Sequence, residues 1–291
     1  MKLALGTAQF GLAYGIANQV GQVSLAEANS ILKFAAASGI DTLDTAISYG
    51  DSEHRLGQIG VRNWQVVSKL PAIPDDIVHP MPWIQDIVNS SLQNLNVSKL
   101  YGLLLHRPVQ LLERRGDQIY LALQELKKTG LIEKIGISIY DPAELNNLCP
   151  HFHFDIIQVP FNIIDRRLIQ SGWLNRLAND GVELHARSVF LQGLLLMKSV
   201  DRPSLFNKWS SLFLRWDQWL TEVGLTAQEA SLRYALSYPQ IKKVIVGVDS
   251  VKQLKELTEA AHGPLPYVPN QLFSNDINLL NPANWAKLAL N

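Results

Sequence analysis

Four residues with complementary chemistry stand at or just after the ends of successive apolar segments: Asp44, Tyr49, Lys69 and His106. A phenol is a weak acid, and a nearby ammonium favours its phenolate form, so a lysine beside Tyr49 would make the tyrosine a useful proton donor. A carboxylate such as Asp44 would keep that lysine charged, and His106 could hydrogen-bond a substrate carbonyl oxygen. Together these residue types predict a catalytic centre that transfers a proton to a carbonyl.

Each of the four residues also has an ordinary structural interpretation. Asp44 could cap a helix, Tyr49 could pack in a core, and His106 could satisfy a backbone carbonyl. Lys69 is harder to explain in this way, because a buried ammonium needs a partner. The catalytic interpretation is favoured because all four types occur at consecutive segment ends.

These segments must be neighbouring strands if the four side chains are to meet. Eight short apolar runs alternate with segments of helical periodicity, and each run is apolar nearly throughout, as in a parallel sheet covered on both faces. The predicted strands cover residues 2–7, 41–46, 65–70, 100–106, 134–140, 155–161, 182–188 and 243–248. The predicted helices cover 24–39, 52–59, 82–95, 117–129, a segment from Pro142, 166–179, 205–221, 226–237 and 250–261.

Eight strand–helix units in about 260 residues predict a (β/α)8 TIM barrel, whose catalytic groups gather at the carboxyl ends of the strands. The alternative is an open doubly wound sheet, which normally carries a Gly-rich phosphate motif after its first strand. Here that turn reads GTAQFG and does not fit the motif. No linker divides the chain, so we expect one domain over residues 1–291, with an irregular tail from about Gly263.

The composition argues against several other classes of protein. Among 291 residues, 26 Lys and Arg balance 26 Asp and Glu, which disfavours a basic nucleic-acid surface. The one cysteine, Cys149, excludes an internal disulfide. His151 and His153 lack the further ligands of a metal site, so we predict no metal. With no signal peptide and no run of 18 apolar residues, we expect a cytoplasmic protein that does not bind a membrane.

Three segments carry a resemblance to a known family. DTLDTAISYGDSE (41–53), VVSKL (66–70) and LLLHRP (103–108) resemble the motifs that hold the catalytic tetrad of the aldo-keto reductases. The resemblance extends over nearly the whole chain. It implies a (β/α)8 barrel that reduces an aldehyde or ketone to an alcohol with a nicotinamide cofactor, usually NADPH, and without a metal.

The same resemblance assigns a role to each of the four residues. Tyr49 is the acid that protonates the carbonyl oxygen while the nicotinamide delivers hydride to carbon. Lys69, held by Asp44, makes the tyrosine a stronger acid, and His106 positions the substrate carbonyl.

The resemblance also implies a cofactor site along the other strand ends. Its residues are Gly6, Thr7, Ser138, Gln158, Arg187, Ser188, Leu191, Gln192, Gly193, Gly247, Val248, Asp249, Ser250 and Gln253. Ile139 replaces an asparagine that contacts the carboxamide in relatives. Arg187 stands where many relatives have an aromatic residue that stacks on the nicotinamide, and a guanidinium plane can stack in the same way.

The adenosine end of this site departs further from the family pattern. Some relatives bind the 2′-phosphate of NADPH through a lysine and an arginine at the positions of Gly247 and Gln253. Both cations are absent here, and Asp249 would repel a phosphate if it faced the ribose, while Lys252 could compensate. We expect NADPH from the resemblance, and NADH stays open.

Substrate identity depends on the loops at the catalytic face. Phe10 and Tyr14 would flank the carbonyl pocket if their loop folds over it. The opening GTAQFGLAYGIAN resembles bacterial members found with surface-polysaccharide and nucleotide-sugar genes, which suggests a sugar-like carbonyl. Two other functions are open: a cofactor-sensing regulatory subunit with little turnover, and a Schiff-base aldolase using Lys69 as nucleophile. Asp44 disfavours the aldolase, because it would keep the lysine protonated.

Overall fold

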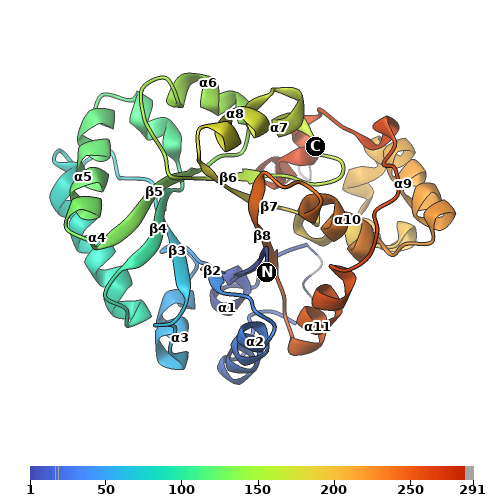
Figure 1. Cartoon of the computed structure of the whole chain (residues 1–291), viewed down its shortest axis with the longest axis horizontal. Helices are drawn as coiled ribbons and strands as arrows, with labels where there is room; N and C mark the ends of the chain where they lie inside the picture. Colours follow the sequence, from blue (N-terminus) through green and yellow to red (C-terminus); the bar gives the residue numbers. More distant parts are fainter. Residues whose placement is uncertain (17, 19, 286–291) are drawn as a thin grey trace.

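The computed structural model describes residues 1–16, 18 and 20–285. Within them, eight strands close into a barrel in chain order, with every neighbouring pair parallel (Figure 1). The strands are β1 (Leu3–Gly6), β2 (Thr42–Asp44), β3 (Gln65–Leu70), β4 (Leu100–Leu105), β5 (Ile132–Ser138), β6 (Ile156–Pro160), β7 (Glu183–Arg187) and β8 (Ile241–Gly247). The predicted (β/α)8 barrel is confirmed, and β1 pairs with β8 where an open sheet would have two edges.

Helices surround the barrel, with α11 between α2 and α10 on its outside (Figure 1). The α-helices are α1 (Ala8–Gly11), α2 (Leu25–Ala37), α3 (Ser52–Ile59), α4 (Pro80–Leu95), α5 (Gly116–Lys128), α6 (Leu145–Leu148), α7 (Arg167–Gln170), α8 (Trp173–Asn179), α9 (Ser210–Val223), α10 (Ala227–Leu236), α11 (Val251–Ala260) and α12 (Ile277–Leu280). Short 3-10 helices are η1 (Pro108–Leu112), η2 (Pro142–Glu144), η3 (Leu191–Leu196), η4 (Ser199–Asp201), η5 (Ser204–Trp209), η6 (Asn270–Leu272) and η7 (Pro282–Asn284). None of the helices in the described part of the chain is long and apolar enough to cross a membrane.

Side chains fill the middle of the barrel, so that the pocket described below lies above a packed floor. Val67, Leu104 and Ile156 form a fully buried apolar cluster there. Two glycines make room for it. A Cβ at Gly102 would lie 2.7 Å from Ile156 Cδ1, and one at Gly136 would lie 2.4 Å from Leu104 Cδ2.

A polar cluster lies below this floor, in the amino-terminal halves of the strands. Lys134 Nζ donates to Glu183 Oε1 at 2.6 Å, and Tyr101 Oη donates to the same carboxylate at 3.0 Å. His185 Nε2 lies 3.6 Å from Glu183 Oε2. Burial by itself raises the pKa of Glu183, but contacts with His185 and Lys134 outweigh it and bring the value to about 2. The cluster is therefore held by a charged carboxylate.

Several predicted element boundaries are wrong. The predicted helix 166–179 divides into α7 and α8 at Gly172, whose φ of 78° is left-handed. The predicted helix 205–221 begins with the 3-10 helix η5, and α1 was not predicted. The predicted strand 134–140 ends at Ser138, although Ile139 just beyond it is fully buried. Apolar sequence indicates burial, and here burial extends one residue past the end of the strand.

Residues 264–285 pack against the carboxyl side of the barrel and contain short helical turns. Ser274 N donates to Ile164 O at 3.0 Å, and Arg166 Nη2 donates to Pro269 O at 3.0 Å. This segment contains η6, α12 and η7, so it is less irregular than predicted. Its contacts join it to the loop after β6.

Candidate active site

A pocket of about 440 Å³ opens at the carboxyl ends of the strands and extends to α11. It brings together residues from β1, β2, β5, β6, β7 and β8 and from the loops that follow the strands. The residues on its wall that sequence predicted are Gly6, Thr7, Tyr14, Asp44, Tyr49, His106, Ser138, Gln158, Arg187, Ser188, Gln192, Gly193, Gly247, Val248, Asp249 and Gln253.

Lys69 and Asp44 form a buried ion pair under the pocket. Lys69 is 1% exposed, and its Nζ donates to Asp44 Oδ2 at 2.7 Å and to Thr45 O at 2.8 Å. Burial alone would lower the pKa of Lys69, but the charge of Asp44 outweighs it and the net pKa is raised. The lysine is therefore charged at neutral pH. Its Nζ lies 5.1 Å from the centre of the Tyr49 ring.

The loop that carries Tyr49 is fixed by close backbone contact with α1. A Cβ at Gly11 would lie 1.8 Å from Tyr49 O, and one at Gly50 would lie 2.3 Å from Gly11 O. Tyr49 N also donates to Ala46 O at 3.0 Å in a tight turn. Only glycine allows this approach at either position, so the two glycines determine where the phenol lies.

His106 stands beside Tyr49, with ring centroids 6.1 Å apart in an edge-on arrangement. Its Nδ1 lies 3.4 Å from Ser48 Oγ. Burial lowers the pKa of His106 to about 4, and the positive charges of Lys69 and Arg187 act in the same direction. The imidazole is therefore neutral at physiological pH.

Gln158 connects the far side of the barrel to Asp44. Its Nε2 donates to Asp44 Oδ1 at 2.6 Å, and its Oε1 accepts from Ser138 Oγ at 3.1 Å. Both carboxylate oxygens of Asp44 are thus engaged, one by Gln158 and one by Lys69. Sequence assigned Ser138 and Gln158 to the cofactor and gave no sign that they also orient Asp44.

Arg187 lies on the pocket wall with one nitrogen unsatisfied. Its Nη2 donates to Ile139 O at 2.8 Å, its Nη1 donates to Ser188 Oγ at 3.1 Å, and its guanidinium lies 4.4 Å from the centre of the Tyr140 ring. Its Nε is buried without a hydrogen-bond partner. A buried unpaired donor is costly, so this nitrogen makes the arrangement of Arg187 less stable than a fully paired one.

The loop after β7 has an unusual backbone. Ser188, Leu191 and Gln192 have φ of 57°, 47° and 53°, and Gly193 has φ of 92°. The Gln192 side chain also donates to Tyr14 Oη at 3.2 Å, so this loop meets the loop after α1 at the pocket. Such a group of left-handed residues turns the backbone sharply. The sequence indicated an unusual backbone conformation only at Gly193.

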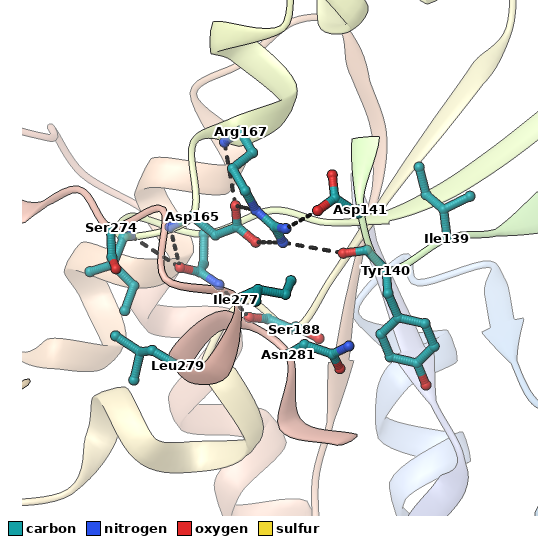
Figure 2. A network of polar contacts seen from close by, with 12 residues as sticks. Ile139, Tyr140, Asp141, Asp165, Arg167, Ser188, Ser274, Ile277, Leu279 and Asn281 are labelled. Atoms are coloured by element: carbon teal, nitrogen blue, oxygen red, sulfur yellow. Dashed lines mark hydrogen bonds and ion pairs between the residues drawn. The ribbon is translucent and has the colours of Figure 1, made fainter. Parts of the chain in front are cut away.

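A network of charged contacts holds the loops behind this wall (Figure 2). Arg167 lies between Asp165 and Asp141, at 2.8 Å from Asp165 Oδ2 and 2.9 Å from Asp141 Oδ2 (Figure 2). Its Nη2 also donates to Tyr140 O at 3.2 Å. Arg167 therefore connects the loop after β6 to the backbone of Tyr140, whose ring lies against Arg187.

Besides Lys69, which lies under the pocket, three predicted site residues lie off the pocket wall. Phe10 is fully buried in the main hydrophobic core, so the prediction that it flanks the carbonyl pocket is corrected. Leu191 is likewise fully buried. Ser250 is the N-cap of α11 and accepts a hydrogen bond from Gln253 N at 3.2 Å.

Sequence missed several residues that line the pocket. They include Gln9, Asn18, Tyr140, Phe190, Leu196, Gln228 and Glu256. Gln9 packs directly on Gly247, where a Cβ would lie 2.5 Å from its Nε2. These residues come from loops and helix faces, where the sequence does not indicate which side chains face the pocket. Within the described residues, no group of three His, Cys, Asp or Glu side chains could hold a metal ion.

The chain is similar in sequence to known proteins. The model of the aldo/keto reductase family matches residues 2–268. The uncharacterized oxidoreductase YqkF of Bacillus subtilis (strain 168) is 29% identical over 256 residues, covering 81% of this chain and 82% of that protein.

Solved structures give the same fold. The holo form of the aldo-keto reductase AKR11C1 from Bacillus halodurans superposes with a TM-score of 0.72 at 20% identity, covering 99% of this chain and 91% of that one. The protein PA4992 from Pseudomonas aeruginosa gives a TM-score of 0.65 at 22% identity, covering 89% of each chain. With the family model matching nearly the whole chain, the protein belongs to the aldo/keto reductase family.

Proposed function

We propose that this oxidoreductase reduces an aldehyde or ketone to an alcohol, with Tyr49 as the proton donor. The observation that carries the proposal is the buried Lys69–Asp44 ion pair beneath Tyr49, with the neutral ring of His106 beside it. The reverse oxidation uses the same groups in the opposite direction.

Each of these residues has a definite task in the proposed reaction. The hydroxyl proton of Tyr49 moves to the carbonyl oxygen, and the positive charge of Lys69 stabilises the phenolate that remains. His106 hydrogen-bonds the carbonyl oxygen through the nitrogen that does not face Ser48. Because His106 is neutral, it orients the substrate and leaves proton donation to the tyrosine.

The residues on the wall fit a nicotinamide dinucleotide, which supplies a hydride when bound. Ser138 and Gln158 offer a hydroxyl and an amide suited to a carboxamide. Arg187 lies on the pocket wall, and its guanidinium plane offers a stacking surface. The sharply turned backbone of residues 188–193 allows close approach of a pyrophosphate.

The same geometry disfavours a Schiff-base aldolase. A lysine attacks a carbonyl only as the neutral amine. Lys69 is held in its charged form by Asp44, and both Asp44 Oδ2 and Thr45 O accept its hydrogen bonds. NADPH as cofactor, a sugar-like substrate and a cytoplasmic location stay predictions of the sequence.

A spectrophotometric screen tests the proposal. Purified protein is mixed with NADH or NADPH and a panel of aldehydes, ketones and keto sugars, and loss of the reduced cofactor is followed at its absorption band. We expect turnover of at least one carbonyl class. Tight cofactor binding with no oxidation of any carbonyl would contradict the proposal and favour a cofactor-sensing regulatory subunit.

A further inference from the structure

The outer end of the pocket is acidic. The pocket runs from Tyr49 and His106 to residues of α11. Figure 1 shows that α11 lies on the outside of the barrel. If the nicotinamide lies at the catalytic end, the adenosine of a dinucleotide extends toward α11. Asp249 and Glu256 line the wall there, and Arg187 is the only Lys or Arg among the described residues that line the pocket.

A third carboxylate occupies the amino terminus of α11. Glu27, on α2, accepts a hydrogen bond from Val251 N at 2.7 Å. A second backbone amide of this turn is also engaged, because Gln253 N donates to Ser250 Oγ at 3.2 Å. A helix amino terminus normally attracts anions, but this one already holds an anionic side chain from the protein itself.

The side chains around Asp249 keep it in place at this wall. Asp249 N donates to Gln253 Oε1 at 2.7 Å, and Asn18 Nδ2 lies 3.4 Å from Asp249 Oδ1. These contacts come from α11 and from the loop after α1, so the carboxylate lies where two elements meet.

One lysine on α11, Lys252, pairs with Glu256 but does not line the pocket. Lys252 is 86% exposed, and its Nζ lies 4.0 Å from Glu256 Oε1. It therefore faces solvent and pairs with one of the carboxylates on the wall. A 2′-phosphate at this end would meet Asp249 and Glu256 without a cation from the described pocket wall to bind it.

We propose that this pocket selects NADH over NADPH, with Asp249 and Glu256 as the residues that exclude a 2′-phosphate. The inference rests on the proposed function and replaces the NADPH expected from the family resemblance. A ribose 2′-hydroxyl can donate to a carboxylate, as acidic residues accept it in other NAD sites. A phosphate in the same place adds like charges at short range.

The test is direct equilibrium binding of NADH and of NADPH to the full chain, by calorimetry, without any carbonyl substrate. We expect a Kd for NADH that is lower than that for NADPH by roughly tenfold or more. In Glu256→Lys, the Kd for NADPH should fall several-fold while the Kd for NADH changes little. In Asp249→Asn, the ratio of the Kd for NADPH to the Kd for NADH should also decrease.

Glu259→Lys is the matched control. Glu259 is exposed on the same helix and does not line the pocket. Its substitution by lysine therefore changes the charge of α11 by the same amount as Glu256→Lys, but away from the pocket. It should leave both Kd values unchanged. Equal or tighter NADPH binding by the wild type would overturn the inference and leave the proposed function intact. A Glu259→Lys effect as large as that of Glu256→Lys would also overturn it, and failure of both cofactors to bind would overturn the proposed function as well.

Discussion

Gln158 on β6 donates a 2.6 Å hydrogen bond to Asp44 on β2, across the mouth of the barrel. The same carboxylate accepts from Lys69 on β3 at 2.7 Å. Asp44 therefore links the charged Lys69 beneath Tyr49 to Gln158, whose side chain lines the proposed cofactor pocket. A substitution of Gln158 should therefore affect both the Lys69–Asp44 ion pair and the cofactor side of the pocket.

Gln158→Leu should lower both stability and turnover. The substitution leaves Asp44 Oδ1 buried without its partner, which costs about 1–3 kcal/mol of unfolding free energy. Chemical denaturation measures this cost, and kinetics with the best substrate from the screen should show a lower kcat. Gln158→Glu, which brings a second carboxyl group to Asp44, should be worse at pH 8 than at pH 5. Equal activity of Gln158→Leu and wild type would show that Asp44 needs no such partner.

Tyr49→Phe should remove the proton donor and keep the pocket. Turnover should fall by about 10²–10⁴-fold, the usual contribution of a general acid. The Kd for reduced cofactor, measured by calorimetry, should stay within about twofold of wild type, because only a hydroxyl is lost. Retention of wild-type kcat in this variant would refute the assignment of the tetrad.

The pH dependence of activity should lack the titration of an ordinary histidine. Burial, with Lys69 and Arg187 nearby, lowers the pKa of His106 to about 4, so the ring stays neutral across pH 5–8. A profile of kcat/KM should therefore show no inflection near pH 6.5, the unperturbed value. Since the folded pKa is lowered, His106 also costs stability as pH falls from 6.5 toward 4, where the unfolded chain takes up the proton first. In His106→Gln this part of the acid-induced loss, measured by denaturation at several pH values, should disappear.

Glu183→Gln should destabilise the barrel without altering the catalytic face. With a pKa of about 2, Glu183 contributes stability that is complete above about pH 4.5 and is lost as pH falls toward 2. At pH 7 the variant should lose about 1–3 kcal/mol, because Lys134 keeps its charge and loses its partner. Glu133→Gln, which breaks the exposed pair with Lys99, is the control and should cost less than about 1 kcal/mol. Similar losses in both variants would show that burial of the cluster is unimportant.

Arg167→Met should weaken cofactor binding from a distance. Arg167 bonds Asp165, Asp141 and Tyr140 O, and it touches no reacting group in the proposed mechanism. Loss of these bonds should loosen Tyr140 and, through its ring, Arg187. The Kd for cofactor should rise several-fold, with a smaller change in kcat, and Arg167→Lys should restore little because one ammonium cannot replace the planar fork. An unchanged Kd in Arg167→Met would show that Arg187 is held in place by its other contacts.

The sequence by itself determined the barrel and the four residues under its mouth. Eight apolar runs between helical segments specify parallel strands, and strand ends such as Asp44, Lys69 and His106 converge by the geometry of the fold. The place of each of these residues follows from its position at the end of a strand. The strands themselves are recognisable from their apolar sequence and from the helical periodicity between them. Phe10 and Leu191 were misplaced because they lie in α1 and η3, short helical turns in which the sequence sets no direction for a side chain.

Only the tertiary structure decided what those residues touch. The bond from Gln158 to Asp44 joins residues 114 positions apart, and Glu27 meets Val251 across 224 positions. Such contacts depend on how α2, α11 and the strands pack, and no local pattern encodes the distance between them. The close approach of Gly11 to Tyr49 is another contact of this kind. The need for glycine at position 11 is evident only when the two backbones are placed next to each other.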